Sequence, residues 1–425
     1  MSDLHVGLGF SKNKNSFKAG QEAAAKAFKQ INNCGKLVIV FASIKFNHQR
    51  MLKGIRSITK NIPLIGCSST AEIINGTILN DSVCVMVLNS PRMKVGLSLG
   101  KNTNRNETKA GLTAANMAFN NLGHNVIVSR PIIKENKHWK SCMPYFTLMF
   151  ADSIHSNSAA IIRAVSSILG PGFPIVGGCA GDNFKFKKTY QFYNDQVLEN
   201  SVVLACIYSD LKVGYGVGNG WYALKHSYQV TKAKGTTVYE LNHKPILDVY
   251  KDIFGKKAED PKFSIGKYLG FKSYGEKEYR LRGPLNINKK EKSITFAAEV
   301  PQNSTITLMD GDLQSALAAA KSAAEEAVKT AGTKDIGCAF LFDCAARYLL
   351  FGDKYRKSEI NAVKEVIGKN VPIIGFYTYG EFSPVLGSHG THNATLVILV
   401  ISKNSIKGGY GLFLRAIQNI MGGNI

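Results

Sequence analysis

The 425-residue sequence predicts an α/β fold made of tandem repeats of a helix–strand–helix–strand–hairpin unit, whose mixed sheets are covered by helices. Three observations predict this fold. Three segments share a Pro, two apolar residues and a Gly: PLIGCSSTAEI (63–73), PIVGGCAGDNF (174–184) and PIIGFYTYGEF (372–382). A strand-like apolar run precedes each segment, and an amphipathic helical pattern lies between the run and the segment.

The elements of the unit follow in the same order in each copy. A helix is predicted at about 18–32, 107–122 and 311–331, and a buried strand at 37–41, 145–150 and 338–342. The next helix has apolar residues at helical spacing, for example Ile161, Ile162 and Val165. It ends before an apolar–Pro step, because the residue before Pro is pushed out of the α region. The second strand starts there and leads to Gly66, Gly177 and Gly375.

Each copy then returns through a second apolar run, at 83–88, 202–207 and 395–400. A glycine-rich strand follows at 94–100, 212–218 and 407–413. The first two copies are adjacent, whereas about 90 residues separate the second from the third. We therefore expect two domains, 1–220 with two copies and 221–425 with the third copy and an irregular, surface-exposed insertion at 221–310.

Composition narrows the functional class. The longest apolar runs have the length of a strand, so we expect no membrane span, and the N-terminus lacks a secretory pattern. Eight cysteines without paired spacing suggest a reducing, cytoplasmic setting. The formal net charge of +23 comes from scattered lysines, so a solvated basic surface is the first interpretation and an anionic or nucleic-acid partner the alternative.

The turns after the three glycines are the predicted sites, because ligands usually bind at the carboxyl ends of strands in such sheets. Glycine there permits close approach of a ligand, or simply a tight turn. The third turn is chemically the richest, and its carboxylate suits an amino group. The alternative is that Glu381 caps backbone N–H groups and that the tyrosines pack on the domain. The predicted ligand-binding residues of the turns are Tyr377, Thr378, Tyr379 and Glu381 in the third, Ser69 and Glu72 in the first, and Asp182 in the second.

A second group of residues follows the strand at 338–342 and should open at the same sheet edge as the third turn. It contains Asp343, Cys344 and Arg347. Arg347 could hold a carboxylate or a phosphate bidentately, and the alternative is a surface salt bridge. We predict that Arg347 and Glu381 lie at opposite ends of one pocket and bind the carboxylate and the ammonium group of an amino acid.

No motif for an enzyme is visible, and we expect neither a cofactor nor a metal. His389 and His392 have a ligand-like spacing but no clear third ligand. A cysteine-dependent enzyme using Cys344 or Cys179 is a rival hypothesis, although nothing in the sequence positions a base for either thiol.

The assembled motifs resemble the FIST family of sensory proteins, which have an N-terminal and a C-terminal FIST domain. The resemblance rests on GCSSTAEI (66–73), GGCAGDNF (177–184), the segment 230–255, FDCAARYLLFG (342–352) and GFYTYGEFSP (375–384). Ala71 and Ala346 stand where the family pattern has glycine.

The resemblance implies an intracellular module that binds a small ligand, such as an amino acid, and reports it in signal transduction. The two FIST-like domains account for all of the sequence, so we expect a stand-alone sensor that signals to a separate protein. The alternatives are the cysteine-dependent enzyme and the anion- or nucleic-acid-binding protein.

Overall fold

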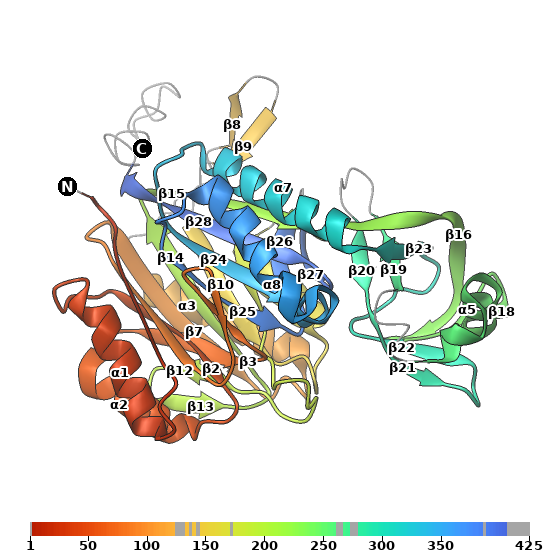
Figure 1. The fold of residues 1–425 in the computed structure, drawn as a ribbon, viewed down its shortest axis with the longest axis horizontal. Helices are drawn as coiled ribbons and strands as arrows, with labels where there is room; N and C mark the ends of the chain where they lie inside the picture. Colours follow the sequence, from red (N-terminus) through yellow and green to blue (C-terminus); the bar gives the residue numbers. More distant parts are fainter. Residues whose placement is uncertain are drawn as a thin grey trace.

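The protein is described by a computed structural model, which covers residues 2–123, 132–135, 138–141, 145–170, 173–260, 267–272, 279–385 and 388–405. Three copies of the predicted unit form one body, and a smaller β-rich part lies beside it (Figure 1). Within the described residues the repeated helices and mixed sheets confirm the predicted α/β fold. The third glycine-rich strand, predicted at 407–413, lies outside them.

Each unit contains two helices, two parallel strands, a short hairpin and a return strand. Unit 1 consists of α1 (Ser16–Lys29), β2 (Leu37–Ser43), α2 (His48–Thr59), β3 (Leu64–Ser69), β4 (Glu72–Ile74), β5 (Thr77–Leu79) and β6 (Val83–Asn89). Unit 2 consists of α3 (Glu107–Leu122), β10 (Tyr145–Ala151), α4 (Ser158–Leu169), β11 (Ile175–Cys179), β12 (Gln191–Tyr193), β13 (Gln196–Leu198) and β14 (Ser201–Ser209). Unit 3 consists of α7 (Leu313–Ala331), β24 (Ile336–Cys344), α8 (Ala345–Ile367), β25 (Ile373–Thr378), β26 (Glu381–Val385), β27 (Ser388–His392) and β28 (Leu396–Ser405).

Three glycine-containing strands complete the sheets at one edge. They are β1 (His5–Ser11), β7 (Met93–Lys101) and β15 (Leu211–Gly218). Gly9 and Gly216 lie against the helices α1 and α7, where an added Cβ would overlap the carbonyl oxygens of Ala23 and Ala323. The small residues therefore allow an alanine-rich helix to pack directly on each edge strand. A separate two-stranded ribbon is formed by β8 (Ile132–Glu135) and β9 (His138–Ser141).

Each hairpin leaves its own unit and joins the sheet of another. The hairpin β4–β5 of unit 1 pairs with β25 of unit 3, β12–β13 of unit 2 pairs with β3 of unit 1, and β26–β27 of unit 3 pairs with β11 of unit 2. The strand orders are β1-β6-β2-β3-β12-β13, β7-β14-β10-β11-β26-β27 and β15-β28-β24-β25-β4-β5. The three units are therefore joined cyclically by exchanged strands.

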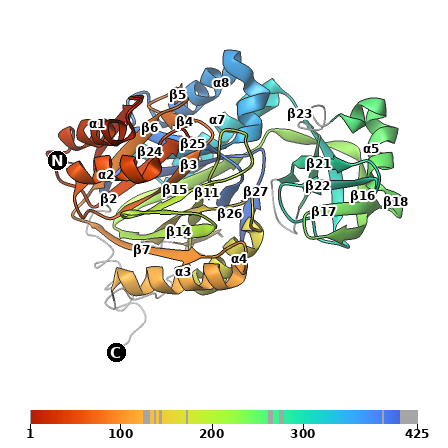
Figure 2. The same cartoon turned by 90° about the horizontal axis from the view of Figure 1, so that it is seen from below.

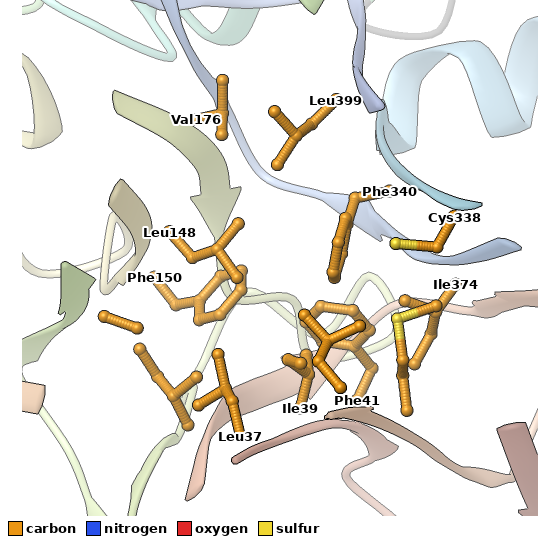
Figure 3. Close-up of a cluster of buried hydrophobic side chains, with 14 of the residues drawn as sticks. Leu37, Ile39, Phe41, Leu148, Phe150, Val176, Cys338, Phe340, Ile374 and Leu399 are labelled. Carbon is orange, nitrogen blue, oxygen red and sulfur yellow. The ribbon is translucent and has the colours of Figure 1, made fainter. Parts of the chain in front are cut away.

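Alternating side chains place one core between the sheets and another beneath each helix pair. Residues such as Leu37, Ile39 and Phe41 of β2 lie in the central core, whereas Val38 and Val40 face α1 and α2. Figure 3 shows the central core, with Leu148 and Phe150 of β10 and Phe340 of β24 converging on the β2 side chains. The helix pairs cover the outer faces of the sheets (Figure 2).

The helices of units 1 and 2 begin at asparagine N-caps. The side chains of Asn15, Asn47, Asn106 and Asn157 each accept a hydrogen bond from a backbone N–H in the first turn of the helix that follows. Such a bond satisfies one of the free N–H groups at a helix start. α7 begins instead at a capping box between Asp312 and Ser315.

The segment 221–310 was expected to be an irregular insertion, and this expectation is wrong. It forms an eight-stranded sheet in the order β20-β19-β23-β16-β17-β22-β21, with β18 on β17, and has a hydrophobic core of its own. Its elements are β16 (Trp221–Lys234), β17 (Thr237–Leu241), β18 (Lys244–Pro245), α5 (Ile246–Phe254), η1 (Gly255–Glu259), β19 (Tyr268–Phe271), β20 (Arg280–Arg282), β21 (Pro284–Asn288), β22 (Ser293–Phe296) and β23 (Thr305–Gly311). We call this part the β unit.

Candidate functional site

One position at the start of each exchanged hairpin is occupied by a buried polar side chain. The residues are Glu72, Gln191 and Glu381, which pair in register with Phe376, Cys67 and Gly178 of the receiving sheets. The residue after each of them faces a helix pair, so these three side chains face the central core. We call them the junction residues.

Hydroxyl and backbone donors hold the carboxyl group of Glu72. The Ser69 hydroxyl donates to Oε1, and the backbone N–H and the hydroxyl of Ser82 donate to Oε2 at 3.2 and 2.6 Å. Burial raises the pKa of Glu72 to about 7, against these donors, which lower it.

Glu381 has corresponding partners in unit 3. The Thr378 hydroxyl donates to Oε1 and the Thr395 N–H donates to Oε2 at 3.3 Å. Burial raises the pKa of Glu381 to about 8, although Thr378 and the Cys344 thiol lower it. Glu381 therefore accepts a hydrogen bond from a backbone N–H group, as the alternative interpretation expected.

The sequence offers Asp182 as the acid of the second turn, one position out of register with Glu72, and the structure gives the matching position to another residue. Unit 2 has eleven residues between β11 and β12, and the matching position belongs to Gln191. The Asp182 carboxylate instead accepts the backbone N–H groups of residues 186, 187 and 188 and the Tyr379 hydroxyl, at 2.7–3.0 Å. Burial would raise the pKa of Asp182, but these donors outweigh it and hold the pKa below its ordinary value.

The loop organised by Asp182 covers the third turn. Phe186 stacks on Tyr379 with ring centroids 4.6 Å apart, and the Phe184 N–H donates to the Tyr379 hydroxyl at 2.7 Å. Phe184 and Phe186 both have positive φ, which is strained for a bulky residue. The second and third predicted turns are thus joined directly.

Arg347 lies in a different buried cluster, on the helix-facing side of β24. Its guanidinium donates to Glu359 and to the carbonyl oxygens of Asn219 and Ala316, and its Nε lies 3.2 Å from Asp343 Oδ1. Arg347, Asp343 and Glu359 are all 0% exposed. The salt bridge that was the alternative to ligand binding is present, but it is buried rather than on the surface.

Strand alternation explains why Arg347 and Glu381 do not form the two ends of one open pocket. Asp343 and Tyr377 are register partners across β24 and β25, and Tyr377 packs in the cluster beneath α7 and α8. The residues beside them, such as Phe342 and Phe376, face the central core. Arg347 and Glu381 therefore share the carboxyl edge of the sheet but lie in separate clusters, and neither a hydrogen bond nor an ion pair joins these two described residues.

The β unit reaches the same edge of unit 3. Trp221 and Tyr268 pack together at 5.3 Å, the Arg347 guanidinium lies 5.9 Å from the Trp221 ring, and both aromatic residues belong to a buried cluster with Ala394. Burial raises the pKa of Tyr268, and Cys344 and Glu381 raise it further. This contact, which we call the unit 3 junction, brings Cys344, Glu381, Arg347 and Tyr268 close to one another.

The buried cysteines of the described residues do not have the properties of nucleophiles. Of those in the described residues, Cys34 is exposed and the other six are buried, and burial raises the pKa of every buried thiol. A reactive thiol needs a lowered pKa and access to solvent. Cys344 and Cys179 meet neither condition.

The described part of the chain was also searched for groups of residues that could bind a metal ion. No cluster of three His, Cys, Asp or Glu residues that could hold a metal ion is found there. His392 Nε2 lies 3.0 Å from the Ser383 hydroxyl, and the side chain of His389 is outside the described residues. The described helices also include none that is both long and apolar enough to cross a membrane.

A surface pocket of about 560 Å³ lies away from these clusters, between α1, β1 and the β4–β5 turn. It is lined by Phe10, Lys26, Lys29 and Gln30 among others, and no carboxylate lines it. None of the predicted ligand-binding residues lines this pocket, whereas several of them gather at the unit 3 junction, so the junction is the candidate site.

Three of the buried residues described above were missed from the sequence. Gln191 was hidden by the longer loop of unit 2, and Tyr268 lay in the segment expected to be irregular. Glu359 could have been found from the repeat. It lies eight residues before the end of α8, and the residues eight before the ends of α2 and α4 are the apolar Met51 and Ile161. A carboxylate at an apolar position of a repeat was the available signal.

Comparison with known proteins agrees with the motif resemblance. The FIST N domain matches residues 36–244 and the FIST C domain matches residues 247–384. An uncharacterised protein of Methanocaldococcus jannaschii is 27% identical over 55% of this chain, and the match spans only 50% of that relative. An uncharacterised protein of Mycobacterium tuberculosis is 22% identical over 92% of this chain and 98% of the relative.

Among solved structures, T. maritima PurL complexed with FGAR aligns with 95% of this chain at 7% identity, with a TM-score of 0.23. This likeness is too weak to indicate a shared fold. The two domain matches together cover most of the sequence, so the chain belongs to the FIST family, whose domains are sensory domains of signal transduction.

Proposed function

We propose that this protein is an intracellular sensor that binds a small molecule, such as an amino acid or a related metabolite, at the unit 3 junction. The observation that carries the proposal is the convergence of Glu381, Cys344 and Arg347 with Tyr268 of the β unit. Ligand sites are common where two folded parts meet at the carboxyl ends of strands. A ligand held there could alter the contact between unit 3 and the β unit, and a separate signalling protein would read that change.

The predicted ligand-binding residues take different parts in this proposal. Glu381, Thr378 and Cys344 border the junction on the core side, and Arg347 and Tyr377 border it on the helix side. Tyr379 and Asp182 fix the loop above. Ser69 and Glu72 form the corresponding polar group in unit 1.

A thermal-shift screen of amino acids and small metabolites tests the proposal. A ligand at 100 times its dissociation constant stabilises a protein by about 2.7 kcal/mol. We expect at least one compound to raise the melting temperature of the wild type and to lose affinity for a Tyr268→Ala variant. A broad screen that raises nothing would remove the support for a sensor.

The rival functions have less support. Catalysis by Cys344 or Cys179 requires an accessible thiolate, and both thiols are buried. Binding of nucleic acid or another large anion is supported by the net charge of +23 alone. It predicts retention on immobilised nucleic acid that falls steeply with salt.

A further inference from the structure

The helix-facing cluster of unit 3 contains buried polar atoms without a hydrogen bond. Within the described residues, both carboxylate oxygens of Asp343, Oε2 of Glu359 and the hydroxyl of Tyr377 accept or donate no hydrogen bond. All three side chains are 0% exposed. Asp343 Oδ1 keeps an ion pair with Arg347 Nε at 3.2 Å. A buried polar atom without a hydrogen bond costs free energy, and a bound group would relieve that cost.

The charges of the cluster balance only while one carboxyl group holds a proton. Burial raises the pKa of Asp343 and the charge of Glu359 raises it further, although Arg347 lowers it. The two carboxylates of Asp343 and Glu359 face one guanidinium, that of Arg347. Arg356 lies one layer further out, with its guanidinium 3.3 Å from the centroid of the Tyr348 ring and paired with Asp353. A single positive charge bound between the two carboxylates would take the place of that proton.

The fold itself does not require these charged residues. Asp343 lies two residues after Leu341, which pairs in register with Gly375. The residues two positions after the register partners of Gly66 and Gly177 are Ala42 and Ala151. Glu359 occupies the helical position of Met51 and Ile161, which are both buried. Two sister units therefore pack the same positions with apolar side chains, so the cluster serves a purpose specific to unit 3.

Tyr377 is an independent sign of a bound group. Its ring is fixed edge-on against Tyr348 with centroids 4.8 Å apart, and its Cα is in register with that of Asp343 on the neighbouring strand. Burial raises the pKa of Tyr377, and the negative charges of Asp343 and Glu359 raise it further, which places the phenol beside both carboxylates. Its hydroxyl nevertheless bonds to neither.

We propose that Asp343, Glu359 and Tyr377 form a binding site for a small monovalent cation, either a primary ammonium group or an inorganic ion of similar size. Arg347 is the positioning residue, because it holds Glu359 in place while its other donors are engaged by Asn219 and Ala316. The proposal rests on the proposed function in that the chain binds a small molecule. It adds that the ligand carries a small positive charge, and it assigns the binding of that charge to Asp343 and Glu359 instead of Glu381.

A bend in α8 divides the residues of the site between two helical arms. Gly352 has φ 53° and ψ 178°, so two helical arms meet there, and Glu359 lies on the second arm while Arg347 lies on the first. Moving the second arm would separate Glu359 from Asp343 and open the cluster. Only glycine adopts such a backbone conformation readily.

The test is a melting-temperature titration of the full chain with ammonium, methylammonium and potassium chlorides. Tetramethylammonium chloride, which carries no N–H donor and is too large for the site, keeps the ionic strength constant. We expect a saturable rise for at least one of the three small cations. A rise with ammonium and methylammonium but not potassium identifies an amine ligand, whereas a rise with ammonium and potassium but not methylammonium identifies an inorganic ion.

Variants locate the effect. Asp343→Asn should weaken the apparent affinity about tenfold or more, because a bond to a charged group is lost. Tyr377→Phe removes only a hydroxyl and should weaken it about two- to tenfold, so it replaces Asp343→Asn if that variant does not fold. Asp353→Asn, on the same helix with a 98% exposed carboxylate, is the matched control and should respond like the wild type.

Two results would overturn the inference. One is a wild-type melting temperature that responds equally to all four chlorides, which would mean that Asp343 and Glu359 merely share a proton. The other is an unchanged affinity in both Asp343→Asn and Tyr377→Phe. A metabolite that binds in the screen while the simple cations do not would refute this inference alone, and a cation response without any metabolite hit would refute the proposed sensor alone.

Discussion

At the scale of single residues, the junction residues connect burial with protonation. Gln191 is a neutral amide at the position of Glu72 and Glu381, whose pKa values burial raises to about 7 and about 8. A protonated carboxyl group has the same shape as an amide and also offers a donor and an acceptor. The position therefore favours a neutral side chain, and the two glutamates meet that requirement by holding a proton near neutral pH.

The first prediction concerns Glu72→Gln. A folded pKa of about 7 against 4.5 unfolded means that the folded state binds the proton more tightly, so this stabilisation is complete below pH 4.5 and is lost as the pH rises to 7. The loss should be about 3 kcal/mol, and Glu72→Gln should abolish it. Urea unfolding between pH 5 and 8.5 measures the slope, with the exposed Glu325→Gln as the control. An identical slope in wild type and Glu72→Gln would contradict the argument.

The second prediction concerns His48, which is buried and bonded to the Ser43 carbonyl oxygen. Burial lowers the pKa of His48 to about 4, so the folded state keeps the ring neutral. Its contribution to stability is present above the unfolded pKa of 6.5 and is lost as the pH falls towards 4. We expect His48→Gln to reduce the acid sensitivity of the melting temperature between pH 6.5 and 4. The exposed His155→Gln variant should melt with the acid dependence of the wild type.

At the scale of elements, the sequence was sufficient wherever the signal was local. The repeated helices and strands follow from apolar periodicity and from the apolar–Pro steps, and the structure contains them. The three glycines were found, but their role was not understood. A Cβ at Gly66, Gly177 or Gly375 would overlap the carbonyl oxygen of Val40, Met149 or Leu341 on the neighbouring strand, so close strand packing explains them without a ligand.

The elements that the sequence did not predict depend on partners distant in the chain. The hairpin starting at Glu72 pairs with a strand some 300 residues later, and nothing in its three-residue strands specifies that partner. The β unit has short strands with register shifts in β16, which weaken the alternation on which strand prediction relies. Arg347 was correctly placed at the sheet edge, but which face it occupies depends on α8, whose bend at Gly352 was not expected.

The third prediction concerns the two arms of α8, which the pair of Arg347 and Glu359 holds together. Arg347→Met leaves two buried carboxylates without a counter-charge and should cost about 3–5 kcal/mol of unfolding free energy. The triple variant Asp343→Ala, Arg347→Met and Glu359→Met replaces all three charges by apolar side chains, which the sister units have at the positions of Asp343 and Glu359, and should cost less than the single change. Urea unfolding compares the two, and a triple variant less stable than Arg347→Met would refute this account of the cluster.

At the scale of the whole molecule, the reactivity of the buried thiols measures how tightly the three units are packed. The six buried cysteines come from all three units, whereas Cys34 is exposed after α1. The fourth prediction is that, in a Cys142→Ser background, one thiol reacts with a chromogenic disulfide reagent under native conditions and six more react only after denaturation. Rapid native labelling of Cys344 or Cys179 would instead revive the cysteine-dependent enzyme.

Cyclic strand exchange has a consequence for cooperativity. Each sheet contains a hairpin from another unit, and the Phe41 ring of unit 1 lies 5.3 Å from Phe150 of unit 2 and 6.4 Å from Phe342 of unit 3. No unit can unfold without removing strands from a neighbouring sheet and exposing its inner face. The three units should therefore open together, unlike an array of repeats that touch only their neighbours.

The last prediction tests this coupling with Phe342→Ala. Truncating a buried phenylalanine costs about 3–5 kcal/mol. If the units unfold together, amide hydrogen exchange of β2 in unit 1 and β10 in unit 2 should lose protection by the same free energy as β24, where the change is made. Leu285→Ala, at a side chain 56% exposed in the β unit, is the control and should leave all three strands unchanged. Loss of protection confined to β24 and its helices would mean that the units open separately, because exchange measures the opening of each segment by itself.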